Sequence, residues 1–249
     1  MHYLVHVLTH SWVVALLVTK VIAIGQPTCV SFRSSPNSFT VVSGGAAAPV
    51  ILSADEWPGV QRAATDFAND IGMVTGVTAK TANATASTIV RTLSTMRGVQ
   101  RLPILVGTLG KSSLISAVVN NTKLDVSNIS GQWESFIVRK VANPLPGLPS
   151  ALVIIGADKR GTIFALYDLS EQFGVSPWFW WADVPTTPQK NLLVEASGCS
   201  QGSPTVKYRG LFLNDEQPAL QNWAMEKFTN GTGAALTGSP FNQFFYTKL

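Results

Sequence analysis

Short apolar runs and a longer helical pattern alternate at the start of the chain. The segments 39–43 (FTVVS) and 49–53 (PVILS) are apolar runs separated by the turn sequence GGAAA, and they predict two strands. In the following segment, 54–76, apolar residues recur at the spacing of one helix face. These residues are Val60, Ala63, Ala64, Phe67 and Ile71. The pattern therefore predicts an amphipathic helix after the two strands.

The alternation of strands and helices continues to residue 174. The pattern predicts strands at 102–108 (LPILVGT), 134–141 (ESFIVRKV) and 151–157 (ALVIIGA), and helices from near Lys111 and at 158–174. The connections are a Thr/Ala/Asn segment, a polar loop at 120–132 and a proline-marked excursion at 142–150. Strands that alternate with helices indicate an α/β layer domain with a mixed sheet.

The character of the chain changes after residue 174. Prolines, glycines and turn residues dominate 175–208, which we interpret as a covering segment and linker. A new strand is predicted at 206–213, and the final nine residues, FNQFFYTKL, have the composition of an apolar helix start. Because that start would leave an apolar face uncovered, we expect this sequence to be the N-terminal portion of a longer protein. The expected domains are 26–204 and 205–249.

The extreme N-terminus is apolar over residues 12–25, with small residues at Ala23 and Gly25. This pattern is typical of a secretory signal peptide covering residues 1–25. An uncleaved membrane anchor is the alternative, and it ranks second because the uninterrupted apolar stretch is short for a bilayer. Four glycosylation acceptor patterns fit the same destination, a secreted extracellular protein. They begin at Asn83, Asn120, Asn128 and Asn230.

Composition excludes several classes of function. The 249 residues are 46% hydrophobic and 13% charged, enough for one domain and part of another. The three histidines all lie within the predicted signal peptide, which removes His-based catalysis and His-ligated metals from the mature chain. Removal of the signal peptide leaves a net charge of +3, too mild and scattered to indicate nucleic acid. We expect no metal, no cofactor and no membrane partner.

The two cysteines, Cys29 and Cys199, flank the main body of the chain. In an oxidising compartment they could form one long-range disulfide, and two free buried thiols are the alternative. Two cysteines without a CxxC spacing exclude a zinc framework.

Five motifs resemble, in the same order, the N-terminal part of glycoside hydrolase family 115. They are LVGTLGKSSLI, GQWESFIV, NPLPG, ALVIIGADKRGTIFALYDLSEQFGVSPWFWWADVP and KYRGLFLNDEQPAL. The resemblance covers roughly residues 40–249, and the sequence is similar to a fungal-type secreted member of the family. It implies a xylan α-1,2-glucuronidase, which removes glucuronic acid or its 4-O-methyl ether from glucuronoxylan. It also implies that an α/β domain precedes a (β/α)8 barrel, whose first strand would be KYRGLFLND, with most of the barrel absent from this chain.

Polar residues at the exit of that strand are the first candidates for catalysis. Catalytic groups of a (β/α)8 enzyme lie at the carboxyl ends of its strands. Side chains alternate along a strand, so Asn214 and Glu216 share one face and Asp215 the other. We expect Glu216 to act as acid or base, or to grip sugar hydroxyls, with Asn214 as its hydrogen-bonding neighbour. An inverting glycosidase needs a second carboxylate, which we expect beyond Leu249. The alternative is a turn cap at Asp215.

Two further clusters are candidates for binding substrate. Lys159 and Arg160 lie at a helix N-terminus, where they oppose the helix dipole and would suit a glucuronate carboxylate. The favoured alternative is that Asp158 caps this helix and the two bases pair with acids of the covering segment. In WFWWADVP, Trp180 or Trp181 could carry a sugar, although an interdomain core is favoured. GTLGKSS lacks phosphate-loop spacing, so we interpret it as a turn and helix cap.

The sequence thus favours an inactive fragment of a xylan α-glucuronidase. A secreted, non-catalytic carbohydrate-binding or scaffolding module is the alternative, and a polysaccharide hydrolase of another specificity is the third.

Overall fold

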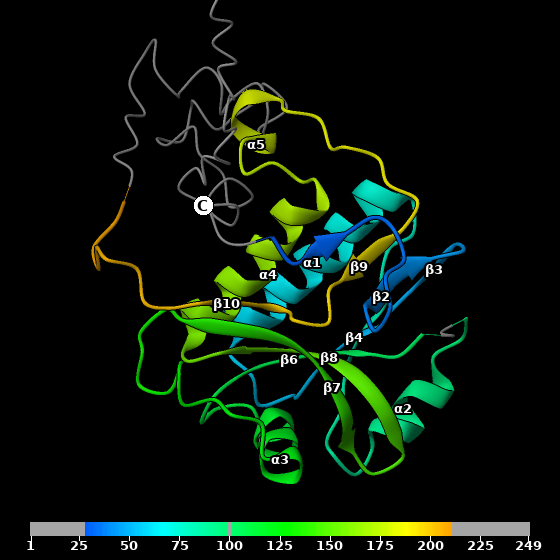
Figure 1. The fold of residues 1–249 in the computed structure, drawn as a ribbon, viewed down its shortest axis with the longest axis vertical. Helices are drawn as coiled ribbons and strands as arrows, with labels where there is room; N and C mark the ends of the chain where they lie inside the picture. Colours follow the sequence, from blue (N-terminus) through cyan, green and yellow to red (C-terminus); the bar gives the residue numbers. More distant parts are fainter. Residues whose placement is uncertain (1–27, 99–100, 211–249) are drawn as a thin grey trace, which may run out of the picture. The chain divides into compact units, whose positions relative to one another are not determined.

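The computed structural model describes residues 28–98 and 101–210 (Figure 1). The chain divides into two units, residues 1–203 and 204–249. The described helices and strands all belong to the first unit. The predicted first barrel strand, 206–213, is described as far as residue 210, and residues 206–210 are not in a strand. Its remainder lies outside the described residues.

The first unit is built on a six-stranded mixed sheet, which confirms the predicted α/β fold class. Strands β5, β4, β6 and β8 are mutually parallel, β7 pairs antiparallel with β8, and β10 pairs antiparallel with β7. In spatial order the strands are β10 (Cys199–Gln201), β7 (Phe136–Leu145), β8 (Leu148–Gly156), β6 (Ile104–Thr108), β4 (Val50–Leu52) and β5 (Thr81–Asn83).

Helices cover both faces of this sheet (Figure 1). They are α1 (Pro58–Thr75) and α4 (Lys159–Phe173) on one face, and α2 (Ile89–Thr95) and α3 (Ser113–Thr122) on the other. Strand side chains alternate between two cores: Ile104 and Val106 pack with α1 and α4, while Leu105 packs with α3. Burial on both faces explains why β6 is continuously apolar in the sequence.

Helix α1 follows the predicted amphipathic pattern. Its buried residues recur at helical spacing and face α4, where the Phe67 and Phe173 rings lie 5.7 Å apart. Pro58 occupies the first turn, where a missing N–H costs nothing. The helix ends at Gly76, which adopts the left-handed conformation with φ of 74°.

A second, four-stranded antiparallel sheet shares the hydrophobic core that contains the buried faces of α1 and α4. Its order is β1 (Val30–Ser31), β9 (Leu192–Val194), β2 (Phe39–Ser43) and β3 (Ala46–Ala47). Strands β9 and β10 and the short helix α5 (Phe179–Ala182) all come from 175–208. The interpretation of this segment as a cover and linker was therefore wrong, because Leu192 and Val194 are fully buried core residues.

The prediction of a proline-marked loop at 142–150 was also wrong. Strands β7 and β8 form one long hairpin in which Leu145 pairs with Leu148. The register shifts between Ala142 and Leu145, and Asn143 takes a positive φ of 46°. Such a bulge accommodates Pro144, which has no N–H to donate to a neighbouring strand.

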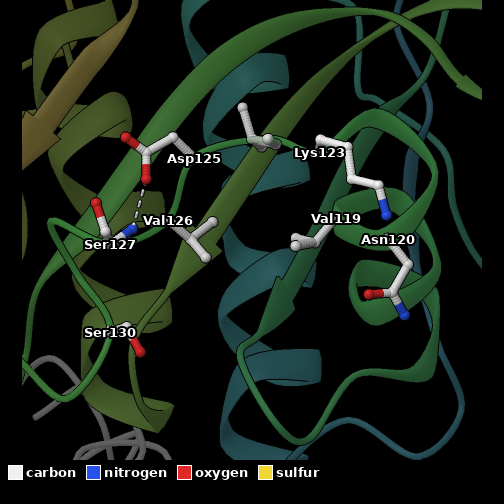
Figure 2. Close-up of a pocket in the computed structure, with 8 residues that line it drawn as sticks. Val119, Asn120, Lys123, Asp125, Val126, Ser127 and Ser130 are labelled. Atoms are coloured by element: carbon white, nitrogen blue, oxygen red, sulfur yellow. Dashed lines mark hydrogen bonds between the residues drawn. The ribbon is translucent and has the colours of Figure 1, made fainter.

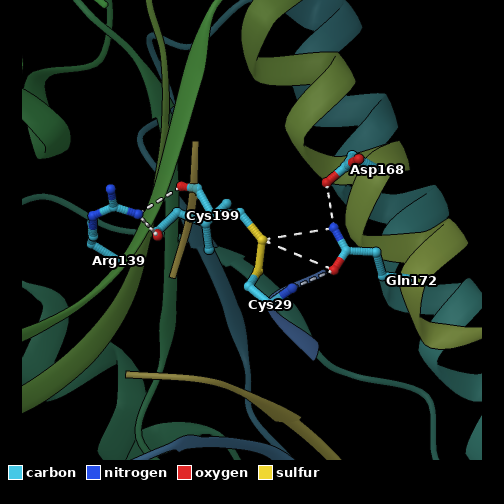
Figure 3. The surroundings of a disulfide bond; sticks show 6 residues. Cys29, Arg139, Asp168, Gln172 and Cys199 are labelled. Atoms are coloured by element: carbon cyan, nitrogen blue, oxygen red, sulfur yellow. Dashed lines mark hydrogen bonds between the residues drawn. A yellow bond between two sulfur atoms is a disulfide. The ribbon is translucent and has the colours of Figure 1, made fainter. Parts of the chain in front are cut away.

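Cys29 and Cys199 form a disulfide with a Cα–Cα distance of 5.5 Å (Figure 3). Both cysteines are buried, and they lie beside Gln172 of α4, whose Oε1 accepts a hydrogen bond from the Cys29 N–H at 2.9 Å. The bond joins the chain at the edge strand β1 of one sheet to the edge strand β10 of the other. The pairing left open by the sequence is therefore settled in favour of the disulfide.

Candidate functional site

Three strand-to-helix connections meet at one edge of the large sheet. They join β4 to α1, β6 to α3 and β8 to α4. Because these strands are parallel, their carboxyl ends lie together with the N-termini of the three helices. Ligands of open α/β sheets bind at this edge, which we call the carboxyl edge. Lys159 and Arg160 lie here, in the first turn of α4.

Glu56 is the central buried group of the carboxyl edge. Its carboxylate accepts hydrogen bonds from the Thr108 N–H at 2.7 Å, the Thr108 hydroxyl at 3.0 Å and the Trp57 N–H at 2.8 Å. The Thr108 hydroxyl also contacts that of Thr162 at 2.8 Å, which links α1, β6 and α4. A carboxylate that is 3% exposed needs this degree of hydrogen bonding to remain buried. We therefore assign Glu56 a structural role.

Helix α3 begins as the sequence indicated. Ser112 is the N-cap residue, and its hydroxyl accepts a hydrogen bond from the Ile115 N–H at 3.2 Å. The same hydroxyl lies 2.8 Å from that of Ser53 at the end of β4. Gly107 allows this close packing, since a Cβ there would lie 2.5 Å from the Ser112 Oγ. The interpretation of GTLGKSS as a turn and helix cap is confirmed.

Asp158 caps α4 and also orders the loop before β7. One carboxylate oxygen accepts a hydrogen bond from the Gly161 N–H at 2.8 Å, and the other accepts one from the Glu134 N–H at 2.9 Å. The carboxylate of Glu134 then pairs with Arg160 at 2.7 Å. Glu134 is 6% exposed and holds a positive φ of 56°. A negative side chain at this helix end offsets the unfavourable placement of Arg160.

The two basic residues predicted to bind substrate, Lys159 and Arg160, have different environments. Arg160 pairs with Glu134, which does not belong to the covering segment that the sequence suggested. Its guanidinium also lies 5.3 Å from the Phe164 ring centre, yet its side chain remains 56% exposed. Lys159 is exposed and has no hydrogen-bond or ion-pair partner among the described residues. Both cations are therefore accessible from solvent at the carboxyl edge.

An exposed aromatic residue lies at the same edge. Trp57, which precedes α1, is 41% exposed, and the Lys111 amine lies 4.8 Å from its ring centre. Asp55 lies nearby in the sequence, and hydrogen bonds from the Ser53 and Ser113 side chains and the Ser113 backbone lower the pKa of its carboxyl. The edge thus combines exposed cations with an aromatic surface.

The remaining predicted site residues fall outside what the structure describes. Asn214 and Glu216 belong to residues 211–249, and the side chain of Trp181 is not described although its backbone is part of α5. Their roles stay predictions. The neighbouring Trp178 is 59% exposed, so it does not belong to the core of the described unit.

Sequence reasoning missed Glu56 and Glu134. Glu56 lies in the segment ADEWPG, where an acid two residues before a helix-starting proline resembles an ordinary solvated turn. Its burial follows from contact with Thr108, 52 residues away, and this contact leaves no local pattern. Glu134 was read as the first residue of a strand, and its left-handed backbone is unusual for that residue type.

Neither a metal centre nor a membrane span is found in residues 28–98 and 101–210. Their His, Cys, Asp and Glu side chains form no cluster of three or more that could hold an ion. None of their helices combines the length and the hydropathy needed to cross a bilayer.

Comparisons with known proteins place this geometry in context. The model of glycosyl hydrolase family 115 matches residues 201–249. A solved structure of the family 115 4-O-methyl-α-glucuronidase BtGH115A, described as specific for decorated arabinogalactans, is 26% identical with a TM-score of 0.55. Both findings show that parts of this chain are similar to family 115. The structural match covers 77% of this chain.

The chain spans 22% of the length of the family 115 glucuronidase that it resembles. A second solved structure, CpGH84D, is 12% identical with a TM-score of 0.36 over 68% of this chain and 22% of that one, too distant to support an inference. No curated protein matches the chain.

Proposed function

We propose that this chain is the N-terminal part of a family 115 glycoside hydrolase that releases glucuronic acid or 4-O-methylglucuronic acid from xylan side chains. The observation that carries this proposal is the match of residues 201–249 to the family model, joined by the 26% identical glucuronidase structure over 77% of the chain. A chain that spans 22% of that relative is proposed to be inactive by itself.

The uronic acid is the common element of the proposed substrates. The resemblance of the motifs favours glucuronoxylan, whereas BtGH115A is described as specific for decorated arabinogalactans. We propose glucuronoxylan as the substrate because the motifs resemble those of family 115, whose members are xylan α-1,2-glucuronidases. Arabinogalactan is the competing polysaccharide that an assay must include.

The chemistry is assigned to the segment after the α/β domain. We propose Glu216 as a general acid or base at the mouth of the barrel, and Asn214 as the neighbour that hydrogen-bonds to it or to the sugar. An inverting hydrolase holds its two carboxyl groups about 6.5–9.5 Å apart, so that a water molecule fits between sugar and base. In the predicted strand Asp215 would lie on the face opposite Glu216, so the second carboxylate is proposed to come from sequence beyond residue 249.

The carboxyl edge is proposed to bind the acidic substrate. Lys159 is exposed without a described partner, and Arg160 keeps 56% of its side chain exposed beside Glu134. A guanidinium or ammonium group favours a uronate carboxylate through a charge-assisted hydrogen bond. Trp181 is proposed to contribute an aromatic face to a sugar ring. These assignments are separate from the proposed catalytic role of Glu216.

The chain is proposed to be secreted into the extracellular space after loss of residues 1–25. Its buried disulfide supports this proposal, because disulfides persist in oxidising compartments and are rare in the cytosol.

The proposed roles can be tested in the protein extended by the reading frame that follows residue 249. Glu216→Gln is expected to lower kcat for uronic acid release by about 10²-fold or more, as expected for a lost acid or base. Asp215→Asn is the matched control and should keep most of the activity. Lys159→Ala should raise KM and leave kcat and Tm unchanged. Wild-type kcat in Glu216→Gln would remove its catalytic assignment, and an unchanged KM in Lys159→Ala would remove the binding role.

A further inference from the structure

Three of the glycosylation acceptor patterns lie within the described unit, and all three asparagines are exposed. Asn83 ends the edge strand β5, Asn120 lies in the last turn of α3, and Asn128 lies in the loop that follows. An attached glycan must extend into solvent, so exposure in the folded chain is a requirement that each position meets. Ile129, the middle residue of the third pattern, is 1% exposed, which anchors that loop to the core.

The end of α3 distinguishes Asn120 from its neighbour Asn121. The Asn121 side-chain amide donates hydrogen bonds to the carbonyl oxygens of Asn143 at 3.1 Å and Pro144 at 3.2 Å. This amide therefore fastens α3 to the β7–β8 hairpin. The acceptor pattern begins one residue earlier, at Asn120, which is exposed. The fold thus uses one asparagine for packing and leaves the acceptor asparagine accessible.

Asn120 forms part of the wall of an open hollow of about 660 Å³ (Figure 2). The wall also contains the half-buried apolar residues Val119, Leu124 and Val126. Helix α3 ends at Lys123, which has a positive φ of 56°, and the chain turns there to form the far side of the hollow. The remaining lining residues are the polar Lys123, Asp125, Ser127 and Ser130. A ligand that removes the three apolar side chains from water lowers the free energy of the folded protein.

We propose that Asn120 carries an N-linked glycan whose first N-acetylglucosamine packs into this hollow, against Val119, Leu124 and Val126. The attachment point in the wall selects this occupant, since a sugar linked to Asn120 is held beside the hollow at high effective concentration. The acetyl group and the apolar face of the sugar ring would make apolar contacts with these three half-buried side chains. Asn128 and Asn83 are proposed as additional acceptors that lie outside the wall.

The modification is a group transfer from a lipid-linked oligosaccharide in the secretory pathway. The Asn120 side-chain nitrogen forms a bond to the anomeric carbon of the sugar and loses one proton. The bond from that carbon to the lipid diphosphate breaks, and the diphosphate leaves with the bonding electrons. Neither an oxidant nor a reductant is required. This proposal is independent of the proposed hydrolase activity.

Attachment can be tested by secreting the full chain from yeast and mapping its glycopeptides by mass spectrometry. We expect the peptide that contains Asn120 to carry a glycan. An unmodified Asn120 peptide in the secreted, folded protein would overturn the proposal.

Packing in the hollow can be separated from attachment by trimming. An endoglycosidase that leaves one N-acetylglucosamine on each asparagine should leave Tm unchanged. Asn120→Gln should lower Tm by about 2–4 °C, the shift for a loss of roughly 1 kcal/mol in a domain of this size. Asn83→Gln is the matched control, since Asn83 does not line this hollow, and Tm should not change. Equal Tm values for Asn120→Gln and the trimmed wild type would overturn the packing.

Hydrogen exchange provides a readout that does not depend on the variant. An amidase that removes the whole glycan from the folded wild-type protein should speed exchange of the amides at 119–127, relative to the form that keeps one sugar. Identical exchange in the two forms would likewise contradict packing in the hollow.

Discussion

The Glu56 carboxylate accepts hydrogen bonds from both the backbone N–H and the hydroxyl of Thr108, at 2.7 and 3.0 Å. The two residues lie 52 positions apart, and their contact joins the start of α1 to the end of β6. Through the hydroxyl of Thr162, 2.8 Å from that of Thr108, the same network reaches α4. One buried acid therefore sets the relative positions of three elements at the carboxyl edge, where the proposed substrate-binding cations are displayed.

Glu56→Gln is expected to destabilise the domain. Glutamine replaces one acceptor oxygen of the carboxylate with an NH2 donor. That NH2 group would face a donor of the protein and could not accept its hydrogen bond. The lost charge-assisted hydrogen bonds predict a fall in the free energy of unfolding of about 1.5–3 kcal/mol. Urea denaturation measures this quantity. Glu171→Gln removes an exposed acid from α4 and should have little effect. Equal stability of both variants would show that the Glu56 network does not hold the edge together.

The elements that the sequence predicted are those with a long local pattern. The apolar face of α1 and the buried runs of β6 and β8 could be recognised because their neighbours in sequence carry the signal. The short antiparallel strands were missed for the opposite reason. Strand β9 has three residues, and it is a strand because it pairs with β1 and β2, from the other end of the chain. Its pattern differs little from that of a turn-rich linker.

The carboxyl edge shows a similar division. The position of Lys159 and Arg160 at the start of α4 could be predicted, because Asp158 is a strong capping residue before a helical pattern. The partner of Arg160 could not be predicted, since Glu134 is 26 residues away and reaches the helix through a left-handed backbone. Local chemistry fixes the end of a helix, whereas tertiary contacts select which acid lies beside it.

Loss of the Cys29–Cys199 disulfide is expected to destabilise the domain. The bond closes a loop across 170 residues of sequence, and removing a native disulfide costs about 2–5 kcal/mol. Because both cysteines serve one bond, Cys29→Ala, Cys199→Ala and the double variant should lose similar amounts. Ser200→Ala, in the same edge strand, is the control. A double variant that loses the sum of the two single losses would contradict a shared bond.

Gly198→Ala is predicted to weaken the docking of β10. Gly198 has a positive φ of 64°, and a Cβ at this position would lie 1.9 Å from the Val138 carbonyl oxygen. The clash and the backbone strain together should cost more than about 1 kcal/mol in the free energy of unfolding. Gly202→Ala is the matched control, because no atom lies within 4 Å of its added Cβ. The two variants should differ clearly in urea midpoint, and equal midpoints would contradict this packing.

The pH dependence of stability should report on Asp168. Burial raises the pKa of this carboxyl, against the hydrogen bond donated by Gln172 at 2.7 Å. Because the pKa in the folded state lies above that in the unfolded state, the stability from the protonated form is present at low pH. It is lost as the pH rises through the folded-state pKa. Asp168→Asn should therefore stabilise the domain at neutral pH. The variant should be no more stable than the wild type at a pH below the ordinary pKa of a carboxyl.

Asp125 provides the contrasting case for the same measurement. Hydrogen bonds from the Ser127 side chain and backbone lower the pKa of this exposed carboxyl. The stability that it contributes is present above the ordinary carboxyl pKa and is lost as the pH falls through the folded-state pKa. Asp125→Asn should thus reduce stability at neutral pH and have little effect in acid. If both variants responded to pH in the same direction, the assignment of the two environments would be wrong.

The central claim is tested most directly by measuring the release of glucuronic acid and its 4-O-methyl ether from glucuronoxylan. Residues 26–249 would be compared with the protein extended by the following reading frame, and decorated arabinogalactan would be the second substrate. We predict release from glucuronoxylan by the extended protein and none by residues 26–249. Release by the shorter protein would contradict a missing second carboxylate. Failure of the extended protein on both polysaccharides would contradict the glucuronidase assignment and favour a carbohydrate-binding or scaffolding module.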